Sequence, residues 1–178
     1  MSVILETERL TLREMVADDL DFVAAMLSDP AVMRFYPKCY SRSEAQTWVE
    51  RQLDRYKEHG RGLWLAEDKT TAEPVGQVGL VVQQINGDAE TEVGYLIHRP
   101  YWRQGLATEA AQACRDFAFR QLEVPHLISL IRPVNIPSQG VARNIGMTWK
   151  GRRVQHAELE HYVYTLSHAE WEAAPSDV

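Results

Sequence analysis

Residues 92–110 contain the residue types and spacing in this sequence that could do chemistry. They read Glu-Val-Gly-Tyr-Leu-Ile-His-Arg-Pro-Tyr-Trp-Arg-Gln-Gly-Leu-Ala-Thr-Glu-Ala, a strand pattern that leads through a short loop into an Ala-rich helix. Gly105 and Ala107 are small, so a ligand could approach the backbone there closely. N–H groups in a first helical turn have no partner inside the helix, and the helix dipole favours an anion. The segment therefore predicts a phosphate or pyrophosphate site, to which Arg103 or Arg99 could add positive charge.

The sequence disfavours several other kinds of site. The dinucleotide pattern G-x-G-x-x-G and the phosphate-loop pattern G-x-x-x-x-G-K-S/T are both absent, which argues against a nicotinamide enzyme or a nucleotide hydrolase. The histidines show no metal-ligand spacing, so we expect no metal. A net charge of −6 gives no support to nucleic acid as the main partner, because phosphate neutralisation needs a clustered basic surface.

The length and the hydropathy pattern set the expected class of protein. A chain of 178 residues suits one domain spanning residues 1–178. No apolar run approaches the roughly 20 residues of a membrane span, so we expect no membrane partner. The N-terminus lacks the basic segment and apolar core of a signal peptide, so we expect a cytoplasmic protein.

The elements that must position residues 92–110 follow from the hydrophobic periodicity and the turn residues. Ser41 and Glu44 have the spacing of a capping box, and Asn86-Gly87-Asp88 is a strong turn signal. The expected strands are Arg9–Glu14, Leu63–Glu67, Val75–Ile85, Glu92–Ile97, His126–Arg132, Met147–Gln155 and His161–Ser167. The expected helices run from Leu20 to Pro30, from Ser41 to Gly60, from Gly105 to about Gln121 and over Ser138–Ile145. This order predicts an α/β or α+β fold with a mixed central sheet.

Tyr101–Ala110 closely resembles the coenzyme A loop of GNAT acetyltransferases, most of all the branch with ribosomal-protein N-terminal acetyltransferases. The superfamily pattern Gln/Arg-x-x-Gly-x-Gly/Ala falls on Trp102, Gly105 and Ala107, where Trp departs from the broad pattern but is familiar in this branch. Three further stretches resemble the same branch in the same order: Glu6–Arg13, Asn135–Met147 and Tyr162–Trp171. The resemblance covers nearly the whole chain. It implies a GNAT-like, mostly antiparallel sheet flanked by helices, with splayed central strands.

The resemblance also implies an acetyl-CoA-dependent N-acetyltransferase that acts on a primary amine of a small molecule or of a peptide or protein N-terminus. Backbone N–H groups of Leu96 or Ile97 would stabilise the oxyanion, and Asn135 would hydrogen-bond the pantetheine arm; without the resemblance, Asn135 reads as a loop residue. The loop expected to hold the pyrophosphate consists of Arg103, Gln104, Gly105, Leu106, Ala107 and Thr108.

Acetyl transfer to an amine needs a base, and the thiolate must leave. By the resemblance, Glu92 is the base, acting through water; Glu90, two residues away on the same face, is its rival. Many relatives place an acidic Tyr where this chain has Ala142. Ser138 is the nearest hydroxyl and the candidate donor to the thiolate. Its alternative role is to cap the short helix, with solvent protonating the thiolate.

The missing Tyr keeps an alternative open, a non-catalytic acetyl-CoA-binding regulatory module, against which Glu92 argues. A purely structural interaction protein is disfavoured by the intact loop. The acceptor would be set by Met33–Ser41 and Lys150–Glu160. Glu158 and Glu160 in the second segment could favour a cationic acceptor, although surface solvation is the default interpretation of both. The sequence does not decide the oligomeric state, and a homodimer is compatible with it.

Overall fold

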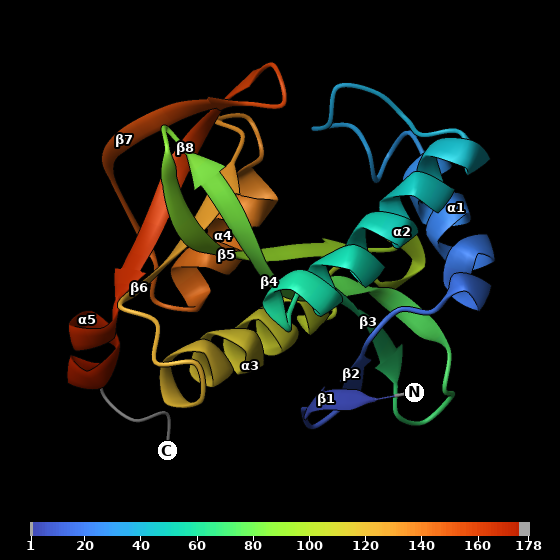
Figure 1. Cartoon of the computed structure of the whole chain (residues 1–178), viewed down its shortest axis with the longest axis horizontal. Helices are drawn as coiled ribbons and strands as arrows, with labels where there is room; N and C mark the ends of the chain where they lie inside the picture. Colours follow the sequence, from blue (N-terminus) through green and yellow to red (C-terminus); the bar gives the residue numbers. More distant parts are fainter. Residues whose placement is uncertain (1, 175–178) are drawn as a thin grey trace.

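A mixed sheet organises the chain. In the computed structural model, which describes residues 2–174, an eight-stranded sheet has the order β1-β2-β3-β4-β5-β6-β8-β7 (Figure 1). The strands are β1 Val3–Glu6, β2 Leu10–Arg13, β3 Leu63–Asp68, β4 Pro74–Ile85, β5 Asp88–Ile97, β6 His126–Ile131, β7 Thr148–His156 and β8 Leu159–Ser167. The helices are α1 Leu20–Ser28, α2 Arg42–His59, α3 Leu106–Arg120, α4 Ile136–Asn144 and α5 His168–Ala173. Neighbouring strands pair antiparallel except β5 and β6, which are parallel. The expected mixed, mostly antiparallel sheet is confirmed.

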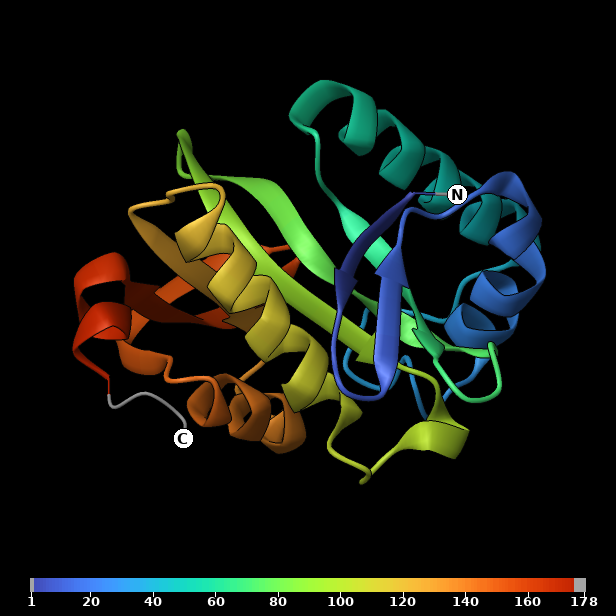
Figure 2. The ribbon, with the colours of Figure 1, turned by 90° about the horizontal axis from the view of Figure 1, so that it is seen from below.

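Helices cover both faces of the sheet, with α3 on one face and α1 and α2 on the other (Figure 2). Strand β3 shows why, because successive strand residues point to opposite faces. Trp64 packs with Ala110 and Ala111 of α3, whereas the next residue, Leu65, packs with Leu27 and Val49 of the other layer. The small side chains on α3 let the helix lie close to the sheet, so its first turn is held at a fixed place beside the strands.

Local signals in the sequence mark several element boundaries correctly. Ser41 and Glu44 form the expected capping box at the start of α2, and Gly60 ends that helix in the left-handed conformation with φ of +67°. Asn86 and Gly87, both with positive φ, make the two-residue turn between β4 and β5. Strand β1 and helix α5 were not expected as separate elements; both are short, and β1 is an edge strand.

The sheet opens between β5 and β6. These two strands pair at one position, Glu92 with Ile128, and then separate. Beyond that point β5 stays with β4 as far as Ile97, and β6 stays with β8 as far as Ile131. The splayed central strands expected from the resemblance are therefore confirmed, and one edge of β5 has no neighbouring strand in its last residues.

Candidate active site

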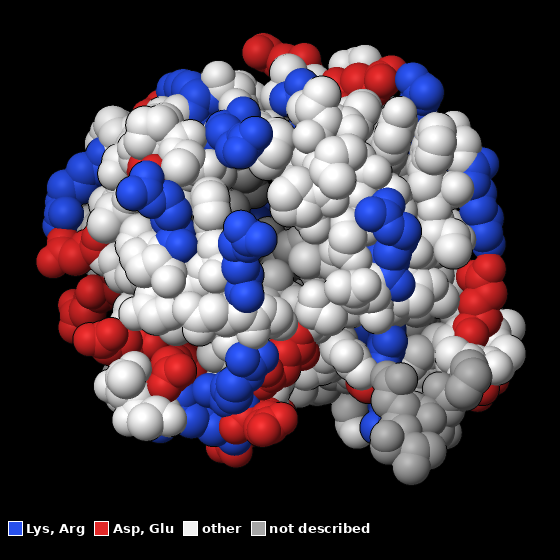
Figure 3. All heavy atoms as spheres, turned by 180° about the vertical axis from the view of Figure 1, so that it is seen from behind, with Lys and Arg blue, Asp and Glu red and all other residues white. Residues whose placement is uncertain are grey.

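The space between the separating strands is a cleft of about 710 Å³. Its walls come from β5, the end of β6, the loop before α3, the first turns of α3 and α4, and the loop between α1 and α2. Figure 3 shows a hollow on this face of the molecule, with Lys and Arg side chains around it. Of the residues predicted from sequence, the cleft walls include Glu92, Leu96, Ile97, Arg103, Gly105, Leu106, Ala107, Thr108, Asn135 and Ser138.

The start of α3 is built to receive an anion. Arg103 and Gly105 both adopt left-handed backbone conformations, with φ of +63° and +78°. Left-handed residues in a loop turn backbone N–H groups toward a common point, which is how anion-binding nests form. No side chain caps α3, so the N–H groups of its first turn, which begins at Leu106, remain available to a ligand.

Gly105 has a second reason to be glycine. A Cβ on Gly105 would lie 3.6 Å from a guanidinium nitrogen of Arg9, which is an ordinary contact, but φ of +78° is strained for any side chain. The sequence suggested that Gly105 leaves space for a ligand, whereas the backbone shows that it also allows the turn into α3. Gln104 is exposed and does not line the cleft; its carbonyl oxygen accepts a hydrogen bond from Arg9 Nη1 at 2.9 Å.

A clasp between the N-terminal strands and α3 supports this loop. Glu109, in the first turn of α3, accepts hydrogen bonds from the backbone N–H of Arg9 at 2.8 Å, from Arg9 Nε at 2.6 Å and from Thr7 Oγ1 at 2.6 Å. The carboxylate also lies near the positive end of the helix dipole. The sequence analysis missed this clasp, because about 100 residues separate its two sides and no local pattern joins them.

The free edge of β5 presents backbone groups to the cleft. In antiparallel strands, the peptide groups of successive residues point alternately to the two sides. His98 N–H donates to Val75 O at 2.9 Å on the β4 side, so Leu96 also faces β4, and Tyr95 and Ile97 face the open edge. Trp102 Nε1 donates to Ile97 O at 2.6 Å, consistent with this direction. Of the two expected oxyanion donors, only Ile97 directs its N–H away from β4.

Glu92 lies where β5 and β6 separate. Its two carboxylate oxygens accept hydrogen bonds from Gln83 Nε2 at 2.6 Å and from the backbone N–H of Leu130 at 3.2 Å. Burial raises the pKa of Glu92 above its usual value, although both hydrogen bonds oppose the shift. A carboxylate with a raised pKa inside a cleft is better matched to accept a proton from an amine than an ordinary one.

Glu90 is engaged elsewhere. Both of its oxygens bind Arg152, at 2.6 and 3.0 Å, and His126 Nε2 lies 3.1 Å from one of them. The bond to Arg152 lowers the pKa of Glu90 despite burial. Glu90 therefore joins β5, β6 and β7 as an ion pair, and it does not line the cleft.

Asn135, not Ser138, caps the start of α4. Asn135 Oδ1 accepts the backbone N–H of Ser138 at 3.1 Å, so Asn135 is the helix cap. The alternative role of Ser138 as the cap is therefore wrong. Ser138 Oγ instead donates to the Tyr95 hydroxyl at 3.2 Å, and that hydroxyl donates to Ser138 O at 2.8 Å.

Tyr95 was missed by sequence reasoning, which looked for a phenol within α4. Ala142 is fully buried there, and the hydroxyl beside α4 comes from β5 instead. Burial raises the pKa of Tyr95 to about 12, so its hydroxyl stays protonated at neutral pH. The Glu-Val-Gly-Tyr spacing could have indicated it, since Tyr95 is three residues after Glu92 on the same strand.

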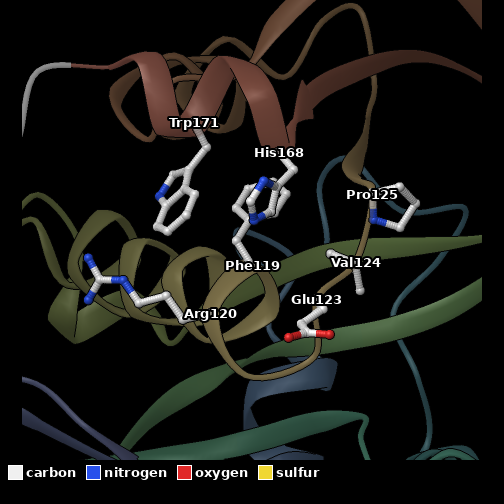
Figure 4. A pocket seen from close by; sticks show the side chains of 7 residues that line it. All are labelled: Phe119, Arg120, Glu123, Val124, Pro125, His168 and Trp171. Atoms are coloured by element: carbon white, nitrogen blue, oxygen red, sulfur yellow. The ribbon is translucent and has the colours of Figure 1, made fainter.

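A second, shallower pocket lies between the end of α3 and α5 (Figure 4). The Phe119 and Trp171 rings stack there at 5.2 Å, and the Arg120 guanidinium lies 5.4 Å from the Trp171 ring. These contacts attach α5 to α3, and no predicted site residue lines the pocket.

Across residues 2–174 there is no group of three or more His, Cys, Asp or Glu side chains that could hold a metal ion. No helix in the same range is long and apolar enough to cross a membrane.

Known proteins resemble the whole of this architecture. Residues 9–148 match the family model described as an acetyltransferase (GNAT) domain. The uncharacterized protein YkkB of Bacillus subtilis is 38% identical over 144 residues, which are 80% of this chain and 84% of YkkB. An acetyltransferase from Agrobacterium tumefaciens is 29% identical, with a TM-score of 0.80 over 93% of this chain and 95% of that chain. The ribosomal L7/L12 α-N-protein acetyltransferase RimL, solved with coenzyme A, shares the fold at 18% identity. Its TM-score is 0.76 over 93% of this chain and 98% of RimL.

The left-handed backbone at Gly105 generates a test of the loop. We expect Gly105→Ala to lower the free energy of unfolding by about 1 kcal/mol and to weaken coenzyme A binding about tenfold, because the first-turn amides must shift. Calorimetry would measure the affinity, and urea unfolding the stability. Gly60→Ala is the matched control: φ is +67° and the surroundings are open, so stability should fall equally with the affinity unchanged. Equal affinities in the two variants would remove the loop from the coenzyme site.

Proposed function

The chain belongs to the GNAT acetyltransferase family, and we propose that it transfers the acetyl group of acetyl-CoA to a primary amine in the cleft between β5 and β6. The enzyme domain would span residues 1–178. One observation carries this proposal. A carboxylate with a raised pKa, Glu92, lines the same cleft as the uncapped first turn of α3. An anion site and a base in one cleft are what acetyl transfer from a phosphorylated thioester to an amine requires.

The described residues fit acetyl-CoA. The first-turn amides of α3 and the Arg103 guanidinium would hold the pyrophosphate. The open edge of β5 offers peptide groups of Tyr95 and Ile97 to the amide-bearing pantetheine arm, in the manner of an added strand. Ile97 N–H would then lie near the thioester and stabilise the oxyanion that forms on its carbonyl. Asn135, whose Oδ1 already accepts from Ser138, would offer its amide N–H₂ to the same arm.

Glu92 would take the proton that the acceptor ammonium must lose, directly or through one water. Gln83 and the Leu130 N–H hold the carboxylate in place while leaving each oxygen further acceptor capacity. The amine then attacks the thioester carbon, its nitrogen loses a second proton to solvent, the C–S bond breaks, and coenzyme A leaves as a thiolate. The half-buried position of Glu92 strengthens its attraction for a cationic acceptor, since the local dielectric constant is lower than that of water.

Ser138 and Tyr95 would stabilise that thiolate by a hydrogen bond. Full proton transfer is disfavoured: an alkyl thiol such as cysteine has a pKa of about 8.5, whereas the pKa of Tyr95 is about 12. Transfer from the phenol would therefore be uphill by roughly 5 kcal/mol. A hydrogen bond from Ser138 Oγ avoids this cost, provided that its single proton turns from the Tyr95 hydroxyl to the thiolate. The bond from the Tyr95 hydroxyl to Ser138 O would hold the residue in place, and solvent would deliver the proton. This assignment needs no acidic side chain at position 142, which is a buried alanine.

A screen of thiol release from acetyl-CoA against amines, polyamines, aminoglycosides and peptides with varied first residues tests the function. Release that depends on an added amine supports the transferase. Tight acetyl-CoA binding without release to any amine would support the regulatory module instead.

Glu92→Gln tests the base. We expect turnover at neutral pH to fall about 100-fold, because the ammonium loses its proton acceptor. The loss should shrink at high pH, where free amine is present. The pKa of Glu92 is higher in the folded protein than in the unfolded chain, so folding favours the protonated carboxyl. The free energy of unfolding therefore falls as the pH rises above the ordinary pKa of a glutamate, because the carboxyl must then ionise in the folded protein. Glu92→Gln should therefore be no less stable than the parent at neutral pH, so that unfolding cannot explain the lost turnover.

Glu90→Gln is the control for Glu92→Gln. It removes the partner of Arg152, whose side chain is 44% exposed and can be solvated, so turnover should stay close to that of the parent protein. Lost turnover in Glu90→Gln alone would move the base to Glu90. Full activity in both variants would leave deprotonation to solvent.

Ser138→Ala tests the thiolate donor. Turnover should fall about tenfold, roughly 1.4 kcal/mol, while acetyl-CoA affinity and the melting temperature change little, because Asn135 caps α4. Tyr95→Phe in the Ser138→Ala background should cause little further loss, since Tyr95 acts through Ser138. Asn135→Ala, in contrast to Ser138→Ala, should lower the free energy of unfolding by about 1 kcal/mol, because it removes the cap of α4. Additive losses of turnover from Ser138→Ala and Tyr95→Phe would argue against a shared role.

A further inference from the structure

The charges that line the cleft are unbalanced. Among the described residues, Glu92 is the only acidic residue that lines it, whereas three arginines, Arg34, Arg103 and Arg132, are among the lining residues. Arg103 lies in the loop that would hold the pyrophosphate. Arg34 and Arg132 lie elsewhere, on the loop between α1 and α2 and at the end of β6. In the described part of the chain, neither Arg34 nor Arg132 has a carboxylate within salt-bridge distance.

Arg132 is positioned by a hydrogen bond, but its charge is not paired with a carboxylate within residues 2–174. Its Nη1 donates to the carbonyl oxygen of Phe35 at 3.2 Å, which ties the α1–α2 loop to the end of β6. Its Nε atom is buried and has no hydrogen-bond partner. A guanidinium carries five N–H donors, and leaving a charged group partly buried without an anion costs free energy. Because it has no paired carboxylate, a positioned arginine in a cleft is suited to bind a carboxylate or a phosphate through its terminal N–H groups.

The groups packed around this end of the cleft add no negative charge. His161 and His156 both have lowered pKa values, caused first by burial, with Arg132 among the further causes for His161 and Arg55 for His156. Both imidazoles are therefore neutral at pH 7. Arg55 is itself half-buried, and its Nη1 donates to the amide oxygen of Gln52 at 3.3 Å, not to a carboxylate.

The acidic residues of the β7–β8 turn do not compensate. Glu160 pairs with Arg153 at 3.2 Å, and Glu158 is exposed. Neither lines the cleft. The expectation that these two residues favour a cationic acceptor therefore has no support in the structure.

We propose that the acceptor is an amine that also carries an anionic group, a carboxylate or a phosphate, and that Arg132 binds this group while Glu92 receives the ammonium. This inference rests on the proposed acetyl transfer. Glu92 accepts a hydrogen bond from Leu130 N–H, and Arg132, two residues along the chain from Leu130, lines the same cleft. A carboxylate and a guanidinium in one cleft suit an acceptor that carries an amine and an anion, as in an amino acid, an amino phosphate or an N-terminus followed by an acidic side chain. A polycationic aminoglycoside or polyamine would meet repulsion there.

Charge-matched acceptor pairs test the proposal on the whole chain with acetyl-CoA. The pairs are methionine and methioninamide, phosphoethanolamine and ethanolamine, and tetrapeptides that begin Ser-Asp and Ser-Asn. We expect kcat/KM for the anionic member of at least one pair to exceed that of its neutral partner tenfold or more. The pair that shows it identifies the source of the anion.

Arg132→Gln should abolish that preference, lowering kcat/KM for the anionic member about tenfold and leaving the neutral member within about twofold. Arg132→Lys keeps the positive charge but not the planar guanidinium with its paired N–H donors, so it should retain part of the preference for the anionic acceptor. Arg103→Gln is the control: it should raise the KM for acetyl-CoA and leave the ratio between pair members unchanged.

Equal kcat/KM within every pair, a preference for kanamycin or spermidine, or a preference that survives Arg132→Gln would each overturn the inference while leaving acetyl transfer intact. The ratio in the unaltered protein decides the acceptor class even where a variant fails to fold. Absence of thiol release with every amine would overturn the proposed function, and this inference with it.

Discussion

The separation of β5 from β6 after the pairing of Glu92 with Ile128 is the constraint on which the rest of the site depends. Paired strands would satisfy each other's peptide groups and leave no space between them. Because the strands part, Tyr95 and the N–H of Ile97 have no strand partner on this edge, and the Leu130 N–H is free of the ladder and binds Glu92. A single loss of pairing thus supplies a cleft, a set of backbone donors and an anchored carboxylate. The long pairing of β5 with β4, and of β6 with β8, holds the two sides apart.

The second requirement is that α3 begins at a fixed point beside this opening. Small side chains on its buried face set the distance to the sheet, and the clasp of Glu109 with Thr7 and Arg9 fixes its first turn. The N-terminal strands therefore act on the site without lining it. Trp102 adds a third attachment, because its indole N–H binds the carbonyl oxygen of Ile97 and ties the loop to the strand end.

Much of the fold could be predicted from the sequence, because local chemistry marks it. Ser41 with Glu44, Asn86 with Gly87, and Gly105 before an alanine-rich run each signal a boundary that the structure contains. Local chemistry also singled out Gly105 and Ala107 in the cleft loop, whereas the roles expected for Glu92, Ile97 and Asn135 came from the resemblance to GNAT acetyltransferases. What failed were relations between distant segments. The hydroxyl of Tyr95 beside Ser138 and the carboxylate of Glu109 on Arg9 depend on tertiary packing, and the cap of α4 depends on which of two nearby polar side chains reaches a single N–H.

The division of the cleft between backbone and side chains has a consequence for how the protein can diverge. Coenzyme recognition would rest largely on peptide N–H groups in the first turn of α3 and on the edge of β5, which every residue type but proline supplies. Acceptor recognition would rest on side chains of other residues that line the cleft, such as Arg34, Tyr36 and Arg132. Substitutions of these residues would exchange one acceptor for another while the donor substrate is retained. Selection would then change the preferred acceptor without changing the binding of acetyl-CoA.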